Sequence, residues 1–166
     1  NGDVILKTKE QEIKCHSFVL ETTSDYFKSC IKYENFNGVI KMNLSFEITN
    51  IIINFLYSEK IIDKDLTAGE IIRLFTAISS LQCSDSIIIL KNYYAKKFPK
   101  LLNEDNWHVL LEQIFNTNKY AGLQEMIMEY YENNILNNID LETMFSLKDT
   151  FAFMNGEIKN VLFAIS

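Results

Sequence analysis

The chain opens with alternating apolar and polar positions and changes to a helical period after residue 45. Residues 12–16 alternate apolar and polar side chains, which is typical of a half-buried strand, and residues 3–7 form another short run of strand length. The polar residues 8–11 between them have the length of a hairpin connection. Residues 39–43 alternate in the same way after an Asn-Gly turn signal. The pattern predicts two paired strands and, later, a third strand.

Two short helices are expected between the second and third strands. Residues 17–23 open with an apolar cluster that is too dense for a solvated loop. A second helix follows over residues 24–32, where Ser24 stands in N-cap position ahead of two aromatic residues. Residues 33–38, with the Asn-Gly pair, form the most loop-like stretch of the chain.

The period becomes helical from residue 46 onward. Residues 46–57 carry apolar side chains at i, i+3 and i+4 spacing, which predicts an amphipathic helix. Thr67 and Glu70 match a capping box and indicate the start of the next helix. A further helix is expected over residues 85–98, and Pro99 ends it. The side chains expected to point into the core from this last helix are Ile88, Ile89, Tyr93 and Phe98.

The second half of the chain repeats the design of the preceding helical pair. Asn103 is expected to cap a helix, and residues 120–134 form the next one. Tyrosine pairs stand at positions 93–94 and 130–131, about 37 residues apart, which indicates two successive helical hairpins that pack side by side. Shorter helices are expected at residues 141–145, 147–154 and 157–165.

These elements predict an α+β fold that is mostly helical. A small three-stranded sheet is capped by helices and continues into stacked helical hairpins. Two parts are expected, residues 1–98 and residues 99–166. Five Gly and one Pro in 166 residues argue against a flexible linker between them.

Composition excludes several classes of function. A net charge of -6 and the lack of a Lys/Arg cluster argue against nucleic-acid binding. The densest apolar runs, residues 51–53 and 87–90, are far too short to span a membrane. No signal-peptide pattern is present, and Cys15, Cys30 and Cys83 are an odd number at irregular spacing. We therefore expect reduced core thiols and an intracellular protein, in the cytoplasm or nucleus.

Catalytic or metal-binding chemistry has little support in the sequence. Cys15 and His16 are adjacent, but neighbouring residues of a strand point to opposite faces and do not share a metal easily. We expect His16 to have a structural, hydrogen-bonded role and His108 to lie at the surface or at the boundary of the core. None of the common nucleotide-binding, hydrolase or zinc motifs occurs. The prediction is a non-enzymatic protein without a catalytic site, metal or cofactor.

An apolar cluster in the predicted loop is the best candidate for an interaction site. Ile31, Tyr33 and Phe36 are three large apolar side chains within six residues, and they either fold back on the core or contact a partner. In the second case an aromatic anchor would carry a large share of the binding energy. The candidate partner-binding residues are therefore Ile31, Tyr33, Glu34 and Phe36.

Three stretches of the first half resemble the BTB/POZ domain family. Asp-Val at residues 3–4, CHSFVL at residues 15–20 and SDYF at residues 24–27 are similar to the family's D-V, A-H-K-x-V-L and S-x-Y-F. Residues 46–57 look like its next helix, and the resemblance extends over residues 3–98. It implies a BTB/POZ-like domain over residues 1–98.

The second half is similar to the BACK domain that follows BTB in many such proteins. Residues 102–107, LNEDNW, resemble the BACK entry helix, and residues 119–134 resemble its second helical hairpin. The resemblance implies a BACK-like region over residues 99–166.

The resemblance implies a protein–protein interaction module. Such a BTB–BACK protein would be an oligomerisation or adaptor subunit, either a self-associating homodimer or a substrate adaptor of a cullin-RING ubiquitin ligase. The alternative is a structural self-assembly module without cullin binding.

Two departures from the family pattern bear on these alternatives. Family homodimers usually rest on a helix before the first strand, and the given sequence starts at that strand, so either the helix lies outside it or the dimer mode differs. Cullin-binding members carry a hydrophobic-x-Glu motif in the loop after S-x-Y-F. Here Ile31-Lys32-Tyr33 lacks the Glu, and Glu34 is preceded two places back by Lys32, so the motif is not met.

Overall fold

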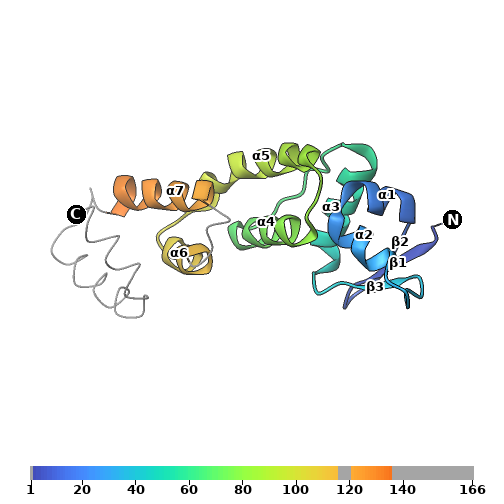
Figure 1. Cartoon of the computed structure of the whole chain (residues 1–166). Coiled ribbons are helices and arrows are strands. Elements are labelled where there is room, and N and C mark those ends of the chain that lie inside the picture. Colours follow the sequence, from blue (N-terminus) through green and yellow to red (C-terminus); the bar gives the residue numbers. More distant parts are fainter. Residues whose placement is uncertain (1, 116–120, 136–166) are drawn as a thin grey trace. The chain divides into compact units, whose positions relative to one another are not determined.

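The structure is a computed structural model that describes residues 2–115 and 121–135 (Figure 1). The chain divides into two units, Asn1–Tyr94 and Ala95–Ser166. The helices predicted at residues 141–145, 147–154 and 157–165 lie outside the described residues. The assignment of the second part as a BACK-like domain stays a prediction.

The first unit contains the predicted three-stranded sheet. Strand β1 (Val4–Lys7) pairs antiparallel with β2 (Glu12–Cys15) and parallel with β3 (Val39–Lys41), so the order is β2-β1-β3. Alternate side chains of the strands point into the core, as the sequence alternation predicted. The buried strand residues are Val4, Leu6, Cys15 and Ile40.

The two short helices after the hairpin are confirmed as α1 (Ser17–Thr23) and α2 (Asp25–Ile31). The N-terminus of α1 is held by the Asp3 carboxylate, which accepts hydrogen bonds from the backbone N–H of Ser17 at 2.8 Å and from its hydroxyl at 2.6 Å. Ser24 is the N-cap of α2 and accepts from the N–H of Phe27 at 3.2 Å.

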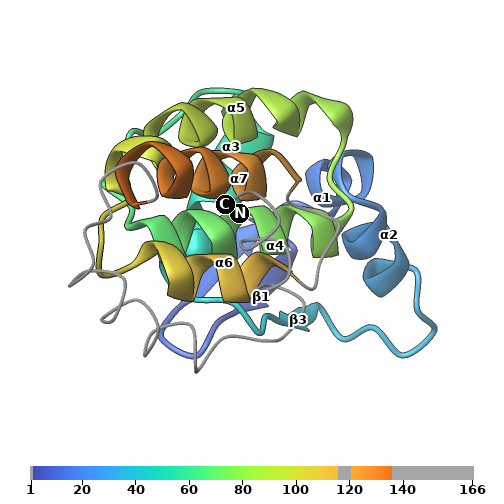
Figure 2. The same cartoon turned by 90° about the vertical axis from the view of Figure 1, so that its left-hand side faces the viewer.

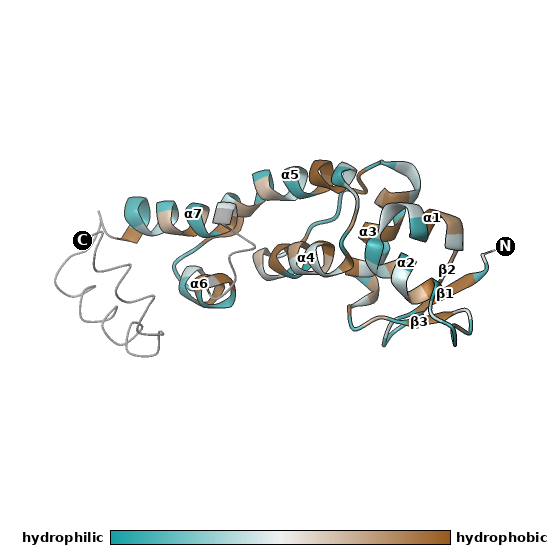
Figure 3. Cartoon of the chain, in the orientation of Figure 1, coloured by the Kyte–Doolittle hydropathy of each residue, from teal (hydrophilic) through white to brown (hydrophobic). Residues whose placement is uncertain are grey.

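Helices α3 (Phe46–Ser58) and α4 (Ala68–Leu81) supply most of the remaining core of this unit. The capping box predicted for α4 is confirmed: Glu70 N–H donates to the Thr67 hydroxyl, and the Glu70 carboxylate accepts from Thr67 N–H at 2.8 Å. Figure 3 shows apolar and hydrophilic residues alternating around α4, as expected of an amphipathic helix. The buried residues of α4 are Ala68, Ile71, Ile72, Leu74, Phe75, Ala77, Ile78 and Leu81.

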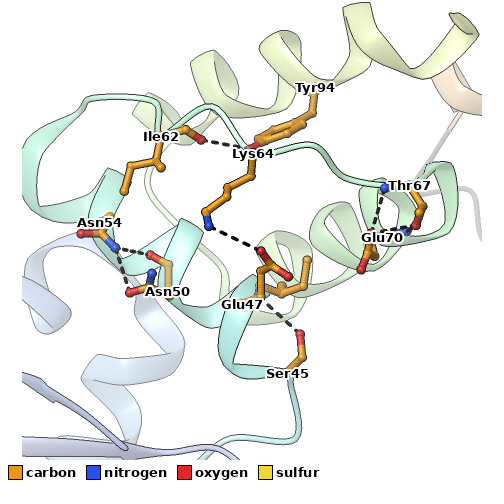
Figure 4. A network of polar contacts seen from close by, with 10 residues as sticks. Ser45, Glu47, Asn50, Asn54, Ile62, Lys64, Thr67, Glu70 and Tyr94 are labelled. Carbon is orange, nitrogen blue, oxygen red and sulfur yellow. Dashed lines mark hydrogen bonds and ion pairs between the residues drawn. The ribbon is translucent and has the colours of Figure 1, made fainter. Parts of the chain in front are cut away.

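The segment between α3 and α4 is tied down by polar contacts (Figure 4). The hydroxyl of the fully buried Tyr94 donates to the carbonyl of Ile62 at 3.1 Å. Lys64 reaches back to the carboxylate of Glu47 near the start of α3, with 3.9 Å between the charged atoms. These contacts order an irregular segment that carries few apolar anchors of its own.

The helix predicted over residues 85–98 is divided, and its buried face was predicted wrongly. A 3₁₀ turn η1 (Asp85–Ile87) precedes α5 (Ile88–Lys97), and Pro99 lies in the following 3₁₀ turn η2 (Phe98–Leu101). Ile88 and Ile89, expected inside, are 58% and 53% exposed, and Tyr93 is only half-buried. Phe98 is buried as predicted.

The buried residues of this segment lie at spacings of three and four positions, on one helical stripe: Ile87, Leu90, Tyr94 and Phe98. In a run of consecutive isoleucines several stripes are equally apolar. The packing of the rest of the unit, and not the local pattern, selects the one that is buried.

The described part of the second unit is helical, as predicted. Asn103 accepts from Asn106 N–H at 3.0 Å and so caps the turn that leads into α6 (Trp107–Phe115). Helix α7 (Ala121–Tyr130) continues into a π turn, η4 (Tyr131–Ile135). The rings of Trp107 and Tyr131, both buried, lie 5.0 Å apart between their centroids. This aromatic contact anchors α6 against the end of α7.

One buried hydroxyl joins helices α2 and α4 of the first unit. Ser24 is 3% exposed, caps α2, and also donates its hydroxyl proton to the carbonyl of Leu81 at the end of α4. Backbone bonds on both sides repeat this link, from Asp25 N–H to Gln82 and from Ser84 N–H to Thr23. Losing the hydroxyl therefore removes a cap and leaves a buried carbonyl without its partner.

We expect Ser24→Ala to lower the free energy of unfolding by about 2 kcal/mol, as the sum of a lost cap and a lost buried hydrogen bond. Ser45→Ala is the matched control, because Ser45 is an exposed N-cap whose side chain accepts only from Ile48 N–H. That change should cost about 1 kcal/mol or less. Urea unfolding measures both, and equal losses would contradict the role given to the Leu81 contact.

Carboxylates hold the starts of three helices. Asp3 accepts from Ser17 at α1, Glu10 from Phe46 N–H at α3 and Glu70 from Thr67 at α4. Hydrogen bonds to the ionised form lower the pKa of Asp3 from its ordinary 3.8 and the pKa of Glu10 and Glu70 from 4.5. A carboxyl whose pKa is lower in the folded chain stabilises the fold above the ordinary value. That contribution is lost as pH falls through the folded value.

We therefore expect the free energy of unfolding to decline as the pH falls below about 4.5, measured by urea titrations at successive pH values. The triple variant Asp3→Asn, Glu10→Gln, Glu70→Gln should be less stable at neutral pH and should show a flatter acid dependence. Glu34→Gln, which removes one loop charge without touching a helix end, is the control. An unchanged slope in the triple variant would contradict this account.

Candidate protein-interaction site

A groove of about 520 Å³ lies between α2, the following loop and β3. We call it the α2–β3 groove. Figure 2 shows the segment between α2 and β3 running outward before it returns to the strand. The residues that line the groove are Tyr26, Ser29, Cys30, Tyr33, Asn35, Phe36, Asn37, Val39, Ile40 and Lys41.

The loop of this groove is fixed at both ends. Phe36 N–H donates to the carbonyl of Tyr33 at 3.0 Å and closes a turn, and Val39 N–H donates to the Asn37 side chain at 3.2 Å. Gly38 has a φ of 84°, a conformation that glycine adopts without strain, and its carbonyl accepts from Ile5 N–H at 2.8 Å. The aromatic side chains of the loop are therefore presented by an ordered backbone.

The structure brings two of the four predicted partner-binding residues onto the groove. Tyr33 and Phe36 both line it, the first 68% exposed and the second half-buried. Ile31 is half-buried at the end of α2 and Glu34 is exposed, and neither is among the lining residues. The cluster thus splits into half-buried and exposed side chains, and its binding role stays a prediction.

The sequence-based prediction missed the two walls on either side of the loop. Tyr26, Ser29 and Cys30 of α2 contribute one wall, and β3 contributes the other. Partial burial raises the pKa of the Tyr26 hydroxyl, and the adjacent Cys30 acts in the same direction. The spacing of residues 26, 29, 30 and 33 is helical, so a signal for the first wall was present in the sequence.

A second exposed apolar feature lies on α1. Phe18 is 75% exposed and borders a shallow hollow of about 570 Å³, which we call the α1 face. A side chain of this size in water is unfavourable unless a partner covers it. The lining residues are Ser17, Phe18, Glu21, Thr22, Asp25 and Lys28.

Cys15 and His16 point to opposite faces, as predicted. Cys15 is buried and His16 is exposed, its backbone N–H donating to the Tyr57 hydroxyl and its Nδ1 lying 3.2 Å from the same oxygen. The hydrogen-bonded role predicted for His16 is confirmed. Burial raises the pKa of the Cys15 and Cys83 thiols to about 11, so both stay protonated at neutral pH.

The described residues carry no group of three His, Cys, Asp or Glu side chains placed to hold a metal ion. His108, expected at the surface or at the boundary of the core, is half-buried beside Trp107. Over the same residues, no helix is both long enough and apolar enough to cross a membrane.

Comparison with known proteins identifies the class of the first unit. The model of the BTB/POZ domain family matches residues 1–103, more than half of the chain. The chain therefore belongs to the BTB/POZ domain family. Domains of this family are non-enzymatic protein–protein interaction modules and commonly self-associate.

Among solved structures, the BTB domain of zebrafish PATZ1 is similar to this chain, with 26% sequence identity and a TM-score of 0.47. The match covers 57% of this chain and 76% of that one. No curated protein matches.

Proposed function

We propose that this chain is a self-associating intracellular adaptor that uses the α2–β3 groove to bind a cullin as part of a ubiquitin ligase. The observation that carries the proposal is the exposed Tyr33 on an ordered loop. That loop follows the S-x-Y-F helix, the place where cullin-binding members of the family carry their contact motif. The groove is lined by aromatic, aliphatic and small polar residues with one lysine, and these residues suit the binding of a protein partner.

Pre-organisation supports binding at this loop. A partner that covers Tyr33 gains apolar burial without first ordering the backbone, because the turn from Tyr33 to Phe36 and the Gly38 contact with β1 are already formed. Tyrosine loses little side-chain entropy on binding and offers both a ring and a hydroxyl. A central aromatic anchor of this kind is typical of interface hot spots.

Because the loop lacks the hydrophobic-x-Glu pattern, a cullin would contact a different arrangement of residues here. Glu34 directly follows the exposed Tyr33 and is itself exposed, so a carboxylate is available in the loop although the spacing differs. In this proposal Tyr33 is the apolar contact and Glu34 the charged one.

The α1 face favours a second candidate, a structural self-assembly module that does not bind cullin. Phe18 is the most exposed large apolar side chain of the described residues. If two chains cover their α1 faces with each other, self-association accounts for this exposure without a cullin contact.

We expect the full chain to bind a cullin N-terminal domain in a pull-down at micromolar concentration. Tyr33→Ala and Phe36→Ala should each weaken binding by more than about 1 kcal/mol, measured by calorimetry, because each removes an aromatic contact. Phe18→Ala, on the α1 face, is the matched control and should leave this binding unchanged.

Two outcomes would contradict the adaptor proposal. If the unmodified chain does not bind the cullin domain, the self-assembly module stands instead. A large loss of thermal stability in Tyr33→Ala or Phe36→Ala would show that these rings belong to the core.

We expect Phe18→Glu to weaken self-association by about tenfold or more, because it places a charge in an apolar contact. Light scattering after size exclusion over a dilution series measures the change. Ile88→Glu is the control, since Ile88 is also exposed but lies on α5. If both variants weaken self-association equally, or if neither variant weakens it, the α1 face is not the self-association contact.

A further inference from the structure

The outer edge of β3 presents backbone groups that no other strand uses. In the ladder with β1, Ile5 N–H donates to Gly38 and Met42 N–H donates to Lys7, both at 2.8 Å. This parallel register turns the backbone groups of Val39 and Lys41 away from β1. Because the sheet order is β2-β1-β3, they face the edge of the sheet.

One of these four groups is already satisfied, and the two on either side of Ile40 are available. Val39 N–H donates to the Asn37 side chain at 3.2 Å. Within the residues that the structure describes, the Val39 carbonyl and the Lys41 N–H have no hydrogen-bond partner. The two groups bracket Ile40 and form the acceptor–donor pair that an additional strand would bond. Edge strands with such free groups are templates for strand addition.

The α2–β3 groove lies beside this edge and adds a side-chain pocket. Residues paired across a ladder point to the same face of a sheet. Ile40 is 5% exposed and also lines the groove, so a residue paired with Ile40 would point towards the same face. Tyr26 and Phe36 line the groove as well and favour an apolar side chain there.

The charge of Lys41 determines which side chain is favoured at the neighbouring position of the added strand. Lys41 is exposed and is the one charged residue among those that line the groove. The residue of an added strand that pairs with Lys41 points to the same face of the sheet as the Lys41 side chain. An acidic residue is favoured there, because it forms a cross-strand charge pair with the lysine. A partner segment therefore needs an apolar residue next to an acidic one.

We propose that the β3 edge binds an extended peptide segment of a partner as a fourth strand, with an apolar side chain in the α2–β3 groove and an acidic residue against Lys41. This inference rests on the proposed interaction role of that groove and names the kind of segment it takes. Main-chain hydrogen bonds would supply affinity, and the groove and lysine would supply selectivity.

The opposite edge of the sheet offers a natural comparison. Strand β2 carries the exposed Glu12 and Lys14, and Glu12 is paired with Lys7 at 3.2 Å. Charged side chains on an edge strand discourage the addition of another strand, and β2 carries two of them, of opposite sign, against one on β3. Lys14 is therefore the matched control position for Lys41.

The test uses the full chain, a fluorescent peptide of sequence TVDLDVT with blocked ends, and the same peptide N-methylated at its three central residues. Acidic residues flank the leucine, so either strand direction places one against Lys41. We expect the first peptide to bind and the N-methylated one not to, because methylation removes the backbone donors. In amide-detected NMR the Lys41 N–H should shift and exchange more slowly with solvent, while the Lys14 N–H should not change.

Variants separate the contributions of charge and groove. Lys41→Glu should weaken peptide binding by roughly threefold or more, and Phe36→Ala by roughly tenfold. Lys14→Glu should leave it unchanged. Thermal unfolding of each variant identifies any loss of binding that comes from loss of the fold.

Several results would overturn the inference. The first is that the N-methylated peptide binds equally well, or that neither peptide binds. The second is that the amide shifts occur at β2 in place of β3. The third is that, without peptide, the Lys41 N–H is already protected from solvent exchange in a concentration-dependent manner, which would show that a second copy of the chain covers it. Failure here is distinguishable from failure of the proposed function. The cullin experiment measures binding of a cullin domain, with Tyr33→Ala as the variant that the peptide test does not use, and it has its own outcome whether or not the peptide pairs with β3.

Discussion

The Ser24 hydroxyl is the contact on which the arrangement of the first unit depends. It accepts from Phe27 N–H to start α2 and donates to the Leu81 carbonyl to hold the end of α4. The neighbouring backbone bonds, from Asp25 to Gln82 and from Ser84 to Thr23, repeat the link. Because the site is buried, water cannot replace these bonds, and the position of α2 is set by them.

The candidate site inherits its rigidity from two separate restraints. One wall of the α2–β3 groove is α2, which is fixed through Ser24, and the other is β3, which is fixed by its ladder with β1. The loop between them needs only the Asn37-Gly38 turn to connect two walls that are already in place. Binding at such a site requires little ordering of the protein, and this favours recognition of a partner.

Helix α2 contributes to both the α1 face and the α2–β3 groove. Asp25 and Lys28 line the hollow beside Phe18, whereas Tyr26, Ser29 and Cys30 line the groove. The helical period places these two sets on different sides of the same seven-residue helix. Self-association through the α1 face and partner binding through the groove would therefore use one rigid element, as suits a family of interaction modules.

The sequence by itself determined the features that rest on local interactions. Alternation predicted the strands, and the caps at Ser24 and Thr67 predicted helix starts, because a cap and a side-chain period involve only residues near in sequence. Only the tertiary structure decided that β3 lies parallel at the edge and that Ile87 and Leu90, not Ile88 and Ile89, are buried. It also joined Tyr26 and Lys41 to the Tyr33–Phe36 loop in one groove. Strand order and the choice between equally apolar stripes depend on contacts between distant segments, which no local pattern encodes.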